Sequence, residues 1–206
     1  MPVRTAKITG NAKIVIRAKP SIYIDTNICR DFIRGERGIE AIQALGIIRD
    51  RGYSCFTSIL TVMELTDTEK DSVFFIKKLR RGCDFNKMTR ARYQKDLTET
   101  DLEEAGDAAV RFFNQNSFIK FKNLVADDQW NTALTLGSSS NLFASDIIHL
   151  VTAWYCKCSV LLTNDEFFIR EGNAILKTSG ISDKLRICKP HDLSNTLKDM
   201  GFKEEK

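Results

Sequence analysis

The sequence has little glycine and proline for its length: its 206 residues include 11 Gly and 3 Pro. Collagen-like repeats and glycine- or proline-rich disordered segments contain far more of both, so these classes are excluded. There is no internal repeat and no low-complexity stretch. The hydrophobic content of 43% and charged content of 28% are typical of a globular chain that can bury one sizeable core.

Long hydrophobic runs are also absent. No apolar run approaches the roughly 18 residues that a membrane-spanning helix requires. The longest candidate, 147–162, is interrupted by His149 and Lys157. The first residues include basic side chains but lack the continuous apolar core of a signal peptide. We therefore expect a cytoplasmic protein without a membrane partner.

Histidine is scarce, and the cysteines lack the spacing of a metal knuckle. His149 and His191 are the only two histidines, which excludes a histidine-rich metal cage. The six cysteines form no C-x-x-C pair. Most of them lie in apolar stretches, where a thiol behaves as a small hydrophobic group, so we expect reduced core cysteines.

Strand-like and helix-like patterns alternate along the chain. The predicted strands are 21–24, 54–57, 118–121, 160–164 and 185–189. The predicted helices are one around 39–48, one that starts after Ser58, and those at 72–81, 98–116, 127–136 and 145–157, with a flexible loop at 137–141. Strands separated by helices indicate parallel crossovers. The sequence therefore predicts an α/β fold, a three-layer sandwich with a central, mostly parallel five-stranded sheet.

Four acidic residues lie where these segments should meet at one edge of the sheet. Asp25 and Asp165 each follow a predicted strand. Glu64 lies in the helix after the second strand, and Asp146 opens the helix that leads into the fourth. Ligand sites in open α/β sheets form outside the carboxyl ends of the strands. Four carboxylates gathered there would repel one another unless cations neutralised them, so the pattern predicts a divalent-metal site.

Simpler explanations exist for single residues of this set. Asp25 could cap a turn or a helix, and Asp146 could complement a helix dipole. A dehalogenase-type phosphatase would need a second aspartate where Asn27 stands. Glu64 has apolar neighbours on both sides, and a carboxylate in such surroundings needs a partner or an ion. His149, one turn after Asp146, is predicted to be a hydrogen-bonded packing residue and not a catalyst.

The four acids belong to motifs that together resemble the PIN-domain family. The motifs are YIDTN at 23–27, TSILTVME at 57–64, DIIHLVTA at 146–153 and LLTNDEFF at 161–168, in the order found in that family. PIN domains are metal-dependent nucleases that mostly act on RNA, and they include the toxins of toxin–antitoxin pairs. The resemblance implies that Asp25, Glu64, Asp146 and Asp165 match the acidic quartet that holds Mg²⁺ or Mn²⁺. It also implies that Asn27 and Thr163 match polar neighbours that orient those carboxylates.

The preference of magnesium for oxygen ligands suggests how the acids divide their roles. Asp25 and Asp146 would be the principal ligands, and Asp165 would bind through water or hold a second ion. Glu64 would orient a water molecule or help to deprotonate it. The resemblance thus implies an Mg²⁺- or Mn²⁺-dependent endoribonuclease with an RNA substrate, an antitoxin partner and a homodimeric assembly. The alternatives are a housekeeping RNA-processing nuclease and a non-catalytic RNA-binding or scaffolding PIN domain.

The chain is longer than a minimal PIN domain, and its net charge of +4 is unevenly distributed. We expect one domain at 21–200 with an enlarged middle segment at about 66–126. Residues 1–20 would form a basic arm or an extra strand, and 201–206 a tail. In the basic run at 77–95, the candidates for nucleic-acid contact are Lys77, Lys78, Arg80 and Arg81.

Aromatic residues are interleaved with this basic run: Phe74, Phe75, Phe85 and Tyr93. Basic and aromatic side chains together can hold a single-stranded nucleic acid by charge and stacking. The alternatives are a solvated surface for the charges, and a local core or a dimer contact for the aromatics.

Overall fold

The computed structural model describes residues 5–6, 14–15 and 19–202. Its central sheet has five strands in the order β5-β4-β3-β6-β7, and every neighbouring pair is parallel. The strands are β3 (Ser21–Ile24), β4 (Ser54–Thr57), β5 (Ile119–Phe121), β6 (Val160–Leu162) and β7 (Arg186–Cys188). The predicted α/β sandwich with a five-stranded parallel sheet is confirmed, and each strand lies within a predicted range.

The strands contribute side chains to two separate hydrophobic cores, because successive residues of a strand point to opposite faces of the sheet. Ile22 and Ile24 of β3 belong to one buried cluster, whereas Tyr23 belongs to the other. Val160 and Leu161 of β6 divide in the same way. Both faces of the sheet are therefore apolar, and each requires a cover of helices.

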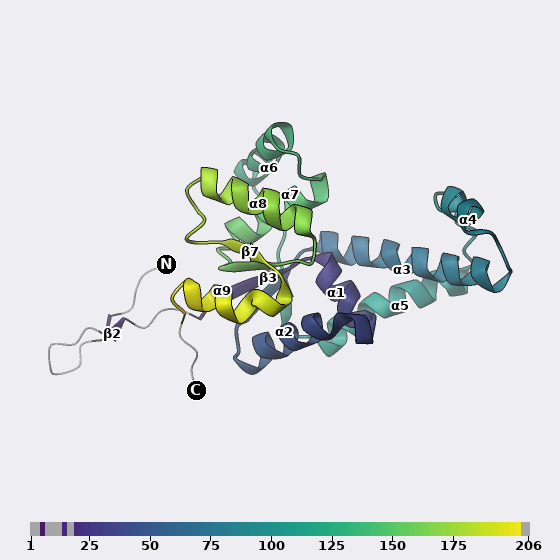
Figure 1. Cartoon of the computed structure of the whole chain (residues 1–206), viewed down its shortest axis with the longest axis horizontal. Helices are drawn as coiled ribbons and strands as arrows, with labels where there is room; N and C mark the ends of the chain where they lie inside the picture. Colours follow the sequence, from purple (N-terminus) through teal and green to yellow (C-terminus); the bar gives the residue numbers. More distant parts are fainter. Residues whose placement is uncertain (1–4, 7–13, 16–18, 203–206) are drawn as a thin grey trace.

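The two helical layers follow from these clusters and are visible in Figure 1. The first layer comprises α1 (Thr26–Ile33), α2 (Ile39–Asp50), α3 (Ile59–Arg80), α5 (Glu99–Gln115) and α9 (Leu193–Asp199). The second comprises α6 (Asp127–Ser139), α7 (Ala144–Tyr155) and α8 (Glu166–Thr178). Short 3-10 turns at Gly35–Gly38 and Pro190–Asp192 complete the helical elements outside the arm described next.

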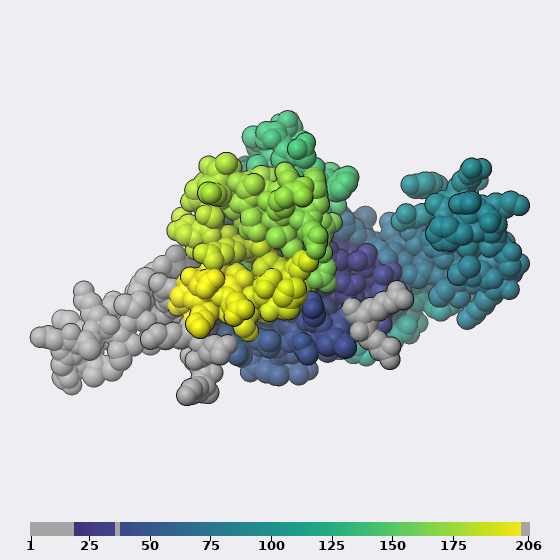
Figure 2. Space-filling model, in the orientation of Figure 1, coloured from purple at the N-terminus to yellow at the C-terminus, as the bar shows by residue number. Residues whose placement is uncertain are grey.

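Helices α3 and α5 pack along each other and extend beyond the sheet as an arm that carries α4 (Phe85–Ala91) at its far end (Figures 1 and 2). The sequence predicted two helices where α3 is continuous, because the polar residues 66–71 interrupt the apolar pattern. None of these residues breaks a helix, and the packing of α3 on α5 stabilises it throughout. Helix α4 was not predicted.

Helix α6 is longer than predicted and covers the first half of the expected loop at 137–141. The hydroxyls of Ser138 and Ser139 donate to the carbonyl of Thr135, and Ser140 donates to that of Leu136. These local bonds let a serine-rich stretch continue a helix.

The two ends of the chain contribute little to this architecture. β1 (Thr5–Ala6) and β2 (Ile14–Val15) form a small antiparallel pair apart from the main sheet. The basic residues of the expected N-terminal arm (Arg4, Lys7, Lys13 and Arg17) and residues 203–206 of the expected tail lie outside the described residues. Within the described part of the chain, no helix combines the length and the apolar character that crossing a membrane requires.

Candidate metal centre

The carboxyl ends of two adjacent strands bring the first site residues together. β3 and β6 pair with Ile24 opposite Leu162, so Asp25 and Thr163, the next residue of each strand, are also neighbours. Glu64 lies in the second turn of α3, and Asp146 in the first turn of α7. One cleft of about 330 Å³ is lined by all four predicted acids: Asp25, Glu64, Asp146 and Asp165. The four carboxylates that the sequence predicted to converge do line a common cleft.

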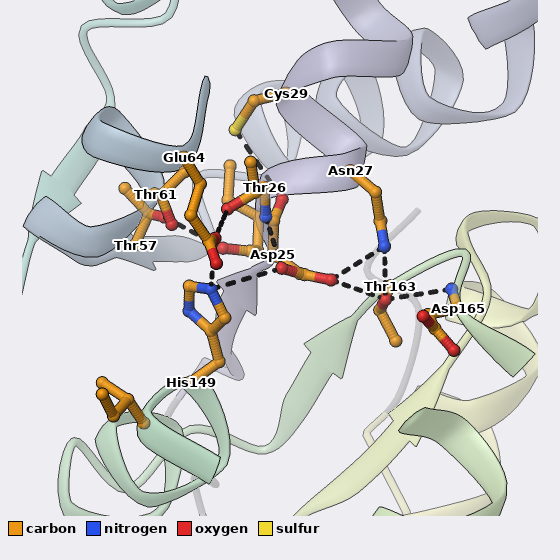
Figure 3. A network of polar contacts seen from close by, with 12 residues as sticks. Asp25, Thr26, Asn27, Cys29, Thr57, Thr61, Glu64, His149, Thr163 and Asp165 are labelled. Atoms are coloured by element: carbon orange, nitrogen blue, oxygen red, sulfur yellow. Dashed lines mark hydrogen bonds and ion pairs between the residues drawn. The ribbon is translucent and has the colours of Figure 1, made fainter. Parts of the chain in front are cut away.

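Asp25 is buried and held from several sides (Figure 3). Its Oδ2 accepts hydrogen bonds from Asn27 Nδ2 at 2.8 Å and from Thr163 Oγ1 at 2.7 Å. Its Oδ1 accepts from the backbone N–H of Thr26 at 2.5 Å, which makes Asp25 the N-cap of α1. Asn27 Oδ1 in turn accepts from the backbone N–H of Asn164 at 2.9 Å. Asn27 and Thr163 thus fix the orientation of this carboxylate.

Asp165 has a structural contact of its own. It is the N-cap of α8, where its Oδ1 accepts from the backbone N–H of Phe168 at 2.9 Å. Its own N–H donates to Thr163 Oγ1 at 3.1 Å. Thr163 therefore joins Asp165 to Asp25.

His149 joins the buried phenol of Tyr23 to two of the acids, Glu64 and Asp25. Its Nδ1 lies 2.8 Å from the hydroxyl of Tyr23. Its Nε2 lies 3.1 Å from Glu64 Oε2 and 3.4 Å from Asp25 Oδ1. The prediction of a hydrogen-bonded packing residue is confirmed, and the structure also places His149 in contact with Glu64 and Asp25. The available signal was its position three residues after Asp146, which places both on one face of α7.

Thr26 is a second contact that sequence reasoning missed. Its hydroxyl donates a hydrogen bond to Glu64 Oε2. Glu64 therefore accepts from both Thr26 and His149, which lie on different elements. No spacing in the sequence signals such a contact between α1 and α3.

The acids differ in how well their negative charge is compensated. Burial raises the pKa of Asp25, although His149 and Thr163 partly oppose that effect. Burial acts in the same direction on Glu64, but hydrogen bonds from His149 and Thr26 outweigh it and lower the pKa. For His149, burial alone would lower the pKa, yet the bond to Glu64 and the charge of Asp25 raise it. His149 is thus a counter-charge for these two acids.

Asp146 lacks such compensation. Burial first, and then the charges of Asp25 and Asp165, raise its pKa to about 6. Its Oδ2 is buried and has no hydrogen-bond partner among the described residues. A buried, unpaired carboxylate oxygen facing three other acids is what a cation would stabilise.

The residues present fit a divalent cation. Asp25, Glu64 and His149 each offer one ligand atom, and these atoms lie within 4.8 Å of one another. This cluster differs from the predicted ligand set of Asp25, Asp146 and Asp165, because it contains Glu64 and His149 in place of the other two aspartates. A carboxylate-rich set suits Mg²⁺ or Mn²⁺, and an added imidazole is also compatible with Mn²⁺.

The predicted nucleic-acid contacts are largely occupied by acids of the arm. Lys77 pairs with Asp101, and Lys78 Nζ lies 3.0 Å from Asp96 Oδ2. Arg81 lies 3.8 Å from the same Asp96 oxygen. None of these residues, nor the exposed Arg80, lines the acidic cleft, whereas Arg30 and Arg92 do. Neither arginine was predicted as a site residue, although Arg92 belongs to the basic run at 77–95.

The aromatic residues of the same segment were predicted either to stack on a nucleic acid or to form a local core or a dimer contact. Phe74 is buried, and the Phe75 ring centroid lies 5.6 Å from that of Phe74 and 6.5 Å from that of Phe85. Tyr93 is 90% exposed. Phe74 and Phe75 therefore belong to a local core, whereas Tyr93 does not.

Comparison with known proteins adds no family to this geometry: no protein-family model and no curated protein matches the chain. The resemblance to PIN domains thus depends on the four motifs alone.

Proposed function

We propose that this protein is a divalent-metal-dependent endoribonuclease of the PIN type. The observation that carries the proposal is the cleft in which four carboxylates meet while Asp146 keeps a buried oxygen without a partner. The fold, with the acids beyond the carboxyl ends of parallel strands, supports the same conclusion. The choice of RNA as the substrate comes from the resemblance of the motifs.

Each residue of the cleft has a defined task in this proposal. Asp25 would bind the ion together with Asp146, whose buried Oδ2 has no partner among the described residues, and Asp165 would bind it through water. Glu64 and His149, whose ligand atoms lie within 4.8 Å of that of Asp25, would complete the site. When bound, Mg²⁺ or Mn²⁺ would neutralise the carboxylates and act as a Lewis acid towards the phosphodiester. Asn27 and Thr163 keep Asp25 in its orientation. Glu64, which His149 and Thr26 keep ionised, can accept a hydrogen bond from the attacking water and so orient it.

Cleavage of a labelled single-stranded RNA tests the proposal. We expect products with Mg²⁺ or Mn²⁺ and none with excess EDTA. The variant Asp146→Asn should lose at least about a hundredfold in rate, because it removes a ligand while keeping the side-chain shape. Asp127→Asn is the matched control, since Asp127 also lies in the first turn of a helix but outside the cleft.

Metal binding provides a second readout that does not depend on activity. Saturating Mn²⁺, at about 100 times its dissociation constant, should stabilise the wild type by about 2.7 kcal/mol in thermal unfolding. Asp146→Asn should show a much smaller shift. A wild type that binds RNA but leaves it intact with either ion would contradict the proposal and favour the non-catalytic alternative.

A further inference from the structure

The acidic cleft continues along α3 away from the sheet. Glu64, Asp67, Thr68 and Asp71 all line it, and their spacing of three and four residues places them on one face of the helix. From Glu64 to Asp71 this face extends about 10 Å, at 1.5 Å per residue. The cleft is therefore a trough that has the four carboxylates at one end and Asp71 at the other.

The acids along the trough are neutralised, unlike those at its inner end. Asp67 pairs with Lys70 at 3.1 Å. Asp71 Oδ2 lies 2.5 Å from Arg92 Nη2, and Asp71 Oδ1 lies 2.8 Å from Lys95 Nζ. One carboxylate thus faces two cations, which leaves one positive charge in excess at the outer end. A polyanion would meet no repulsion there.

Arg92 and Arg30 are the two cations among the described residues that line the trough. Arg92 uses Nε and Nη2 to bind Asp71, which leaves other N–H groups of a half-exposed guanidinium free to bind a ligand. Arg30 projects from α1, and its Nε is buried without a hydrogen-bond partner in the described part of the chain. Its nearest acid, Asp31, is 3.6 Å away and already accepts from Asn164 at 2.7 Å.

We propose that Arg30 and Arg92 bind phosphates of a single polynucleotide strand that runs from the four carboxylates along α3 towards α4. The identity of the ligand rests on the proposed function. Arginine suits this task because its planar fork of donors matches phosphate oxygens. A cleft of about 330 Å³ has the size of a small-ligand site, which suits a few nucleotides of one strand. Asp71 is a positioning residue that aims Arg92 into the trough.

The competing explanation is that Arg92 only fastens the returning segment of the arm to α3. Lys95 separates the two explanations, because it binds the same carboxylate yet does not line the trough. Loss of either side chain removes an ion pair with Asp71, but only the loss of Arg92 removes a phosphate ligand. Arg34 is the matched control for Arg30, since it is the C-cap residue of the same helix, α1, but does not line the trough.

The experiment measures binding of a fluorescent single-stranded RNA to the full chain in the Asp146→Asn background, where cleavage does not interfere. We expect Arg92→Ala and Arg30→Ala each to weaken binding about tenfold, the effect of losing one charged hydrogen-bonded contact. Each should also reduce the slope of log affinity against log salt by about 0.7, the contribution of one phosphate contact on a single strand. Lys95→Ala, which removes a neighbouring charge but no phosphate ligand, should change both quantities far less than Arg92→Ala does, and Arg34→Ala should change neither.

Equal effects of Arg92→Ala and Lys95→Ala on affinity and slope would overturn the proposal. Should Arg92→Ala unfold, Arg92→Lys keeps the charge, and we expect it to retain the slope while binding more weakly than the parent. A wild type that fails to cleave, with variants that bind as expected, would refute the nuclease function and leave this site in place. A wild type that cleaves, with arginine variants that bind like the parent, would refute this site alone.

Discussion

The position of His149 depends on its contact with the hydroxyl of Tyr23. The phenol is buried, and burial raises its pKa, so it remains neutral, and its oxygen lies within hydrogen-bond distance of His149 Nδ1. Tyr23→Phe would leave that nitrogen buried without this partner. We expect a loss of about 1–3 kcal/mol in the free energy of unfolding, measured by denaturant titration.

The same variant should slow RNA cleavage without a large change in KM, because Glu64 would lose a well-placed partner. Tyr53→Phe is the control. The Tyr53 hydroxyl lies 3.5 Å from Arg51 Nη1 at the surface, so its loss should change stability by less than about 0.5 kcal/mol. Equal effects of the two substitutions would show that His149 does not need the phenol.

Asp146 makes the stability of the metal-free protein depend on pH. Its pKa is raised from 3.8 to about 6, so the folded state binds the proton more tightly than the unfolded state. This contribution is complete below about pH 4 and is lost as the pH rises through 6. The full shift corresponds to about 3 kcal/mol, and because the side chain is only half-buried we expect about 1 kcal/mol after solvent screening.

Asp146→Asn should therefore be more stable than the wild type at pH 8 in EDTA and equal to it near pH 4. Denaturant titrations across this range measure the difference. Two curves that stay parallel at all pH values would contradict the raised pKa.

Residue by residue, the sequence predicted the carboxylates but not their partners. Asp25 and Asp165 follow strands, so their positions depend only on a correct assignment of the sheet. The contacts of His149 and Thr26 with Glu64 depend on how α1, α3 and α7 pack, which no local spacing encodes. The pairing of Arg92 with Asp71 likewise joins residues 21 positions apart.

At the scale of elements, the close packing of α8 on β7 depends on Gly172. A Cβ at this position would lie 2.3 Å from Ile187 Cδ1 and 3.4 Å from the Phe168 ring. Both neighbours are buried, so the Ile187 side chain has little room to move. We expect Gly172→Ala to cost about 1–2 kcal/mol of unfolding free energy, despite its better helix propensity.

Gly106 in α5 provides the opposite case. A Cβ there would meet no atom within 4 Å, so Gly106→Ala should stabilise the protein by up to about 1 kcal/mol. Thermal unfolding of both variants tests the pair. A stabilising Gly172→Ala would mean that α8 and β7 adjust more easily than this packing suggests.

Strands proved easier to predict than helices in this chain. Short apolar runs such as Ser21–Ile24 and Ser54–Thr57 match the observed strands because buried parallel strands are apolar on both faces. Helix α3 was divided in the prediction because its central residues face solvent and the cleft instead of an apolar layer. Helix α4 has one buried residue, Met88, and so lacks an apolar period that could reveal it.

At the scale of the whole molecule, the middle of the chain forms an arm whose charges are mostly paired internally. The run at 77–95 appears strongly basic in the sequence, yet Lys77 and Lys78 bind acids 24 and 18 residues further along. Exposed cations without an ion pair among the described residues remain at Arg80, Lys87 and Arg90. Sequence reasoning could not show that the returning segment of this arm reaches back to the cleft, where Arg92 lines it.

The double use of Asp25 and Asp165 has an evolutionary consequence. Each starts a helix by accepting a backbone N–H, so selection for a stable fold alone would preserve both, whatever the activity. Asp146 caps no helix and is costly to bury without an ion. Under the proposed function, we therefore expect position 146 to mutate first in relatives that no longer bind a metal ion. An aspartate retained there would mark a working metal site better than the other two.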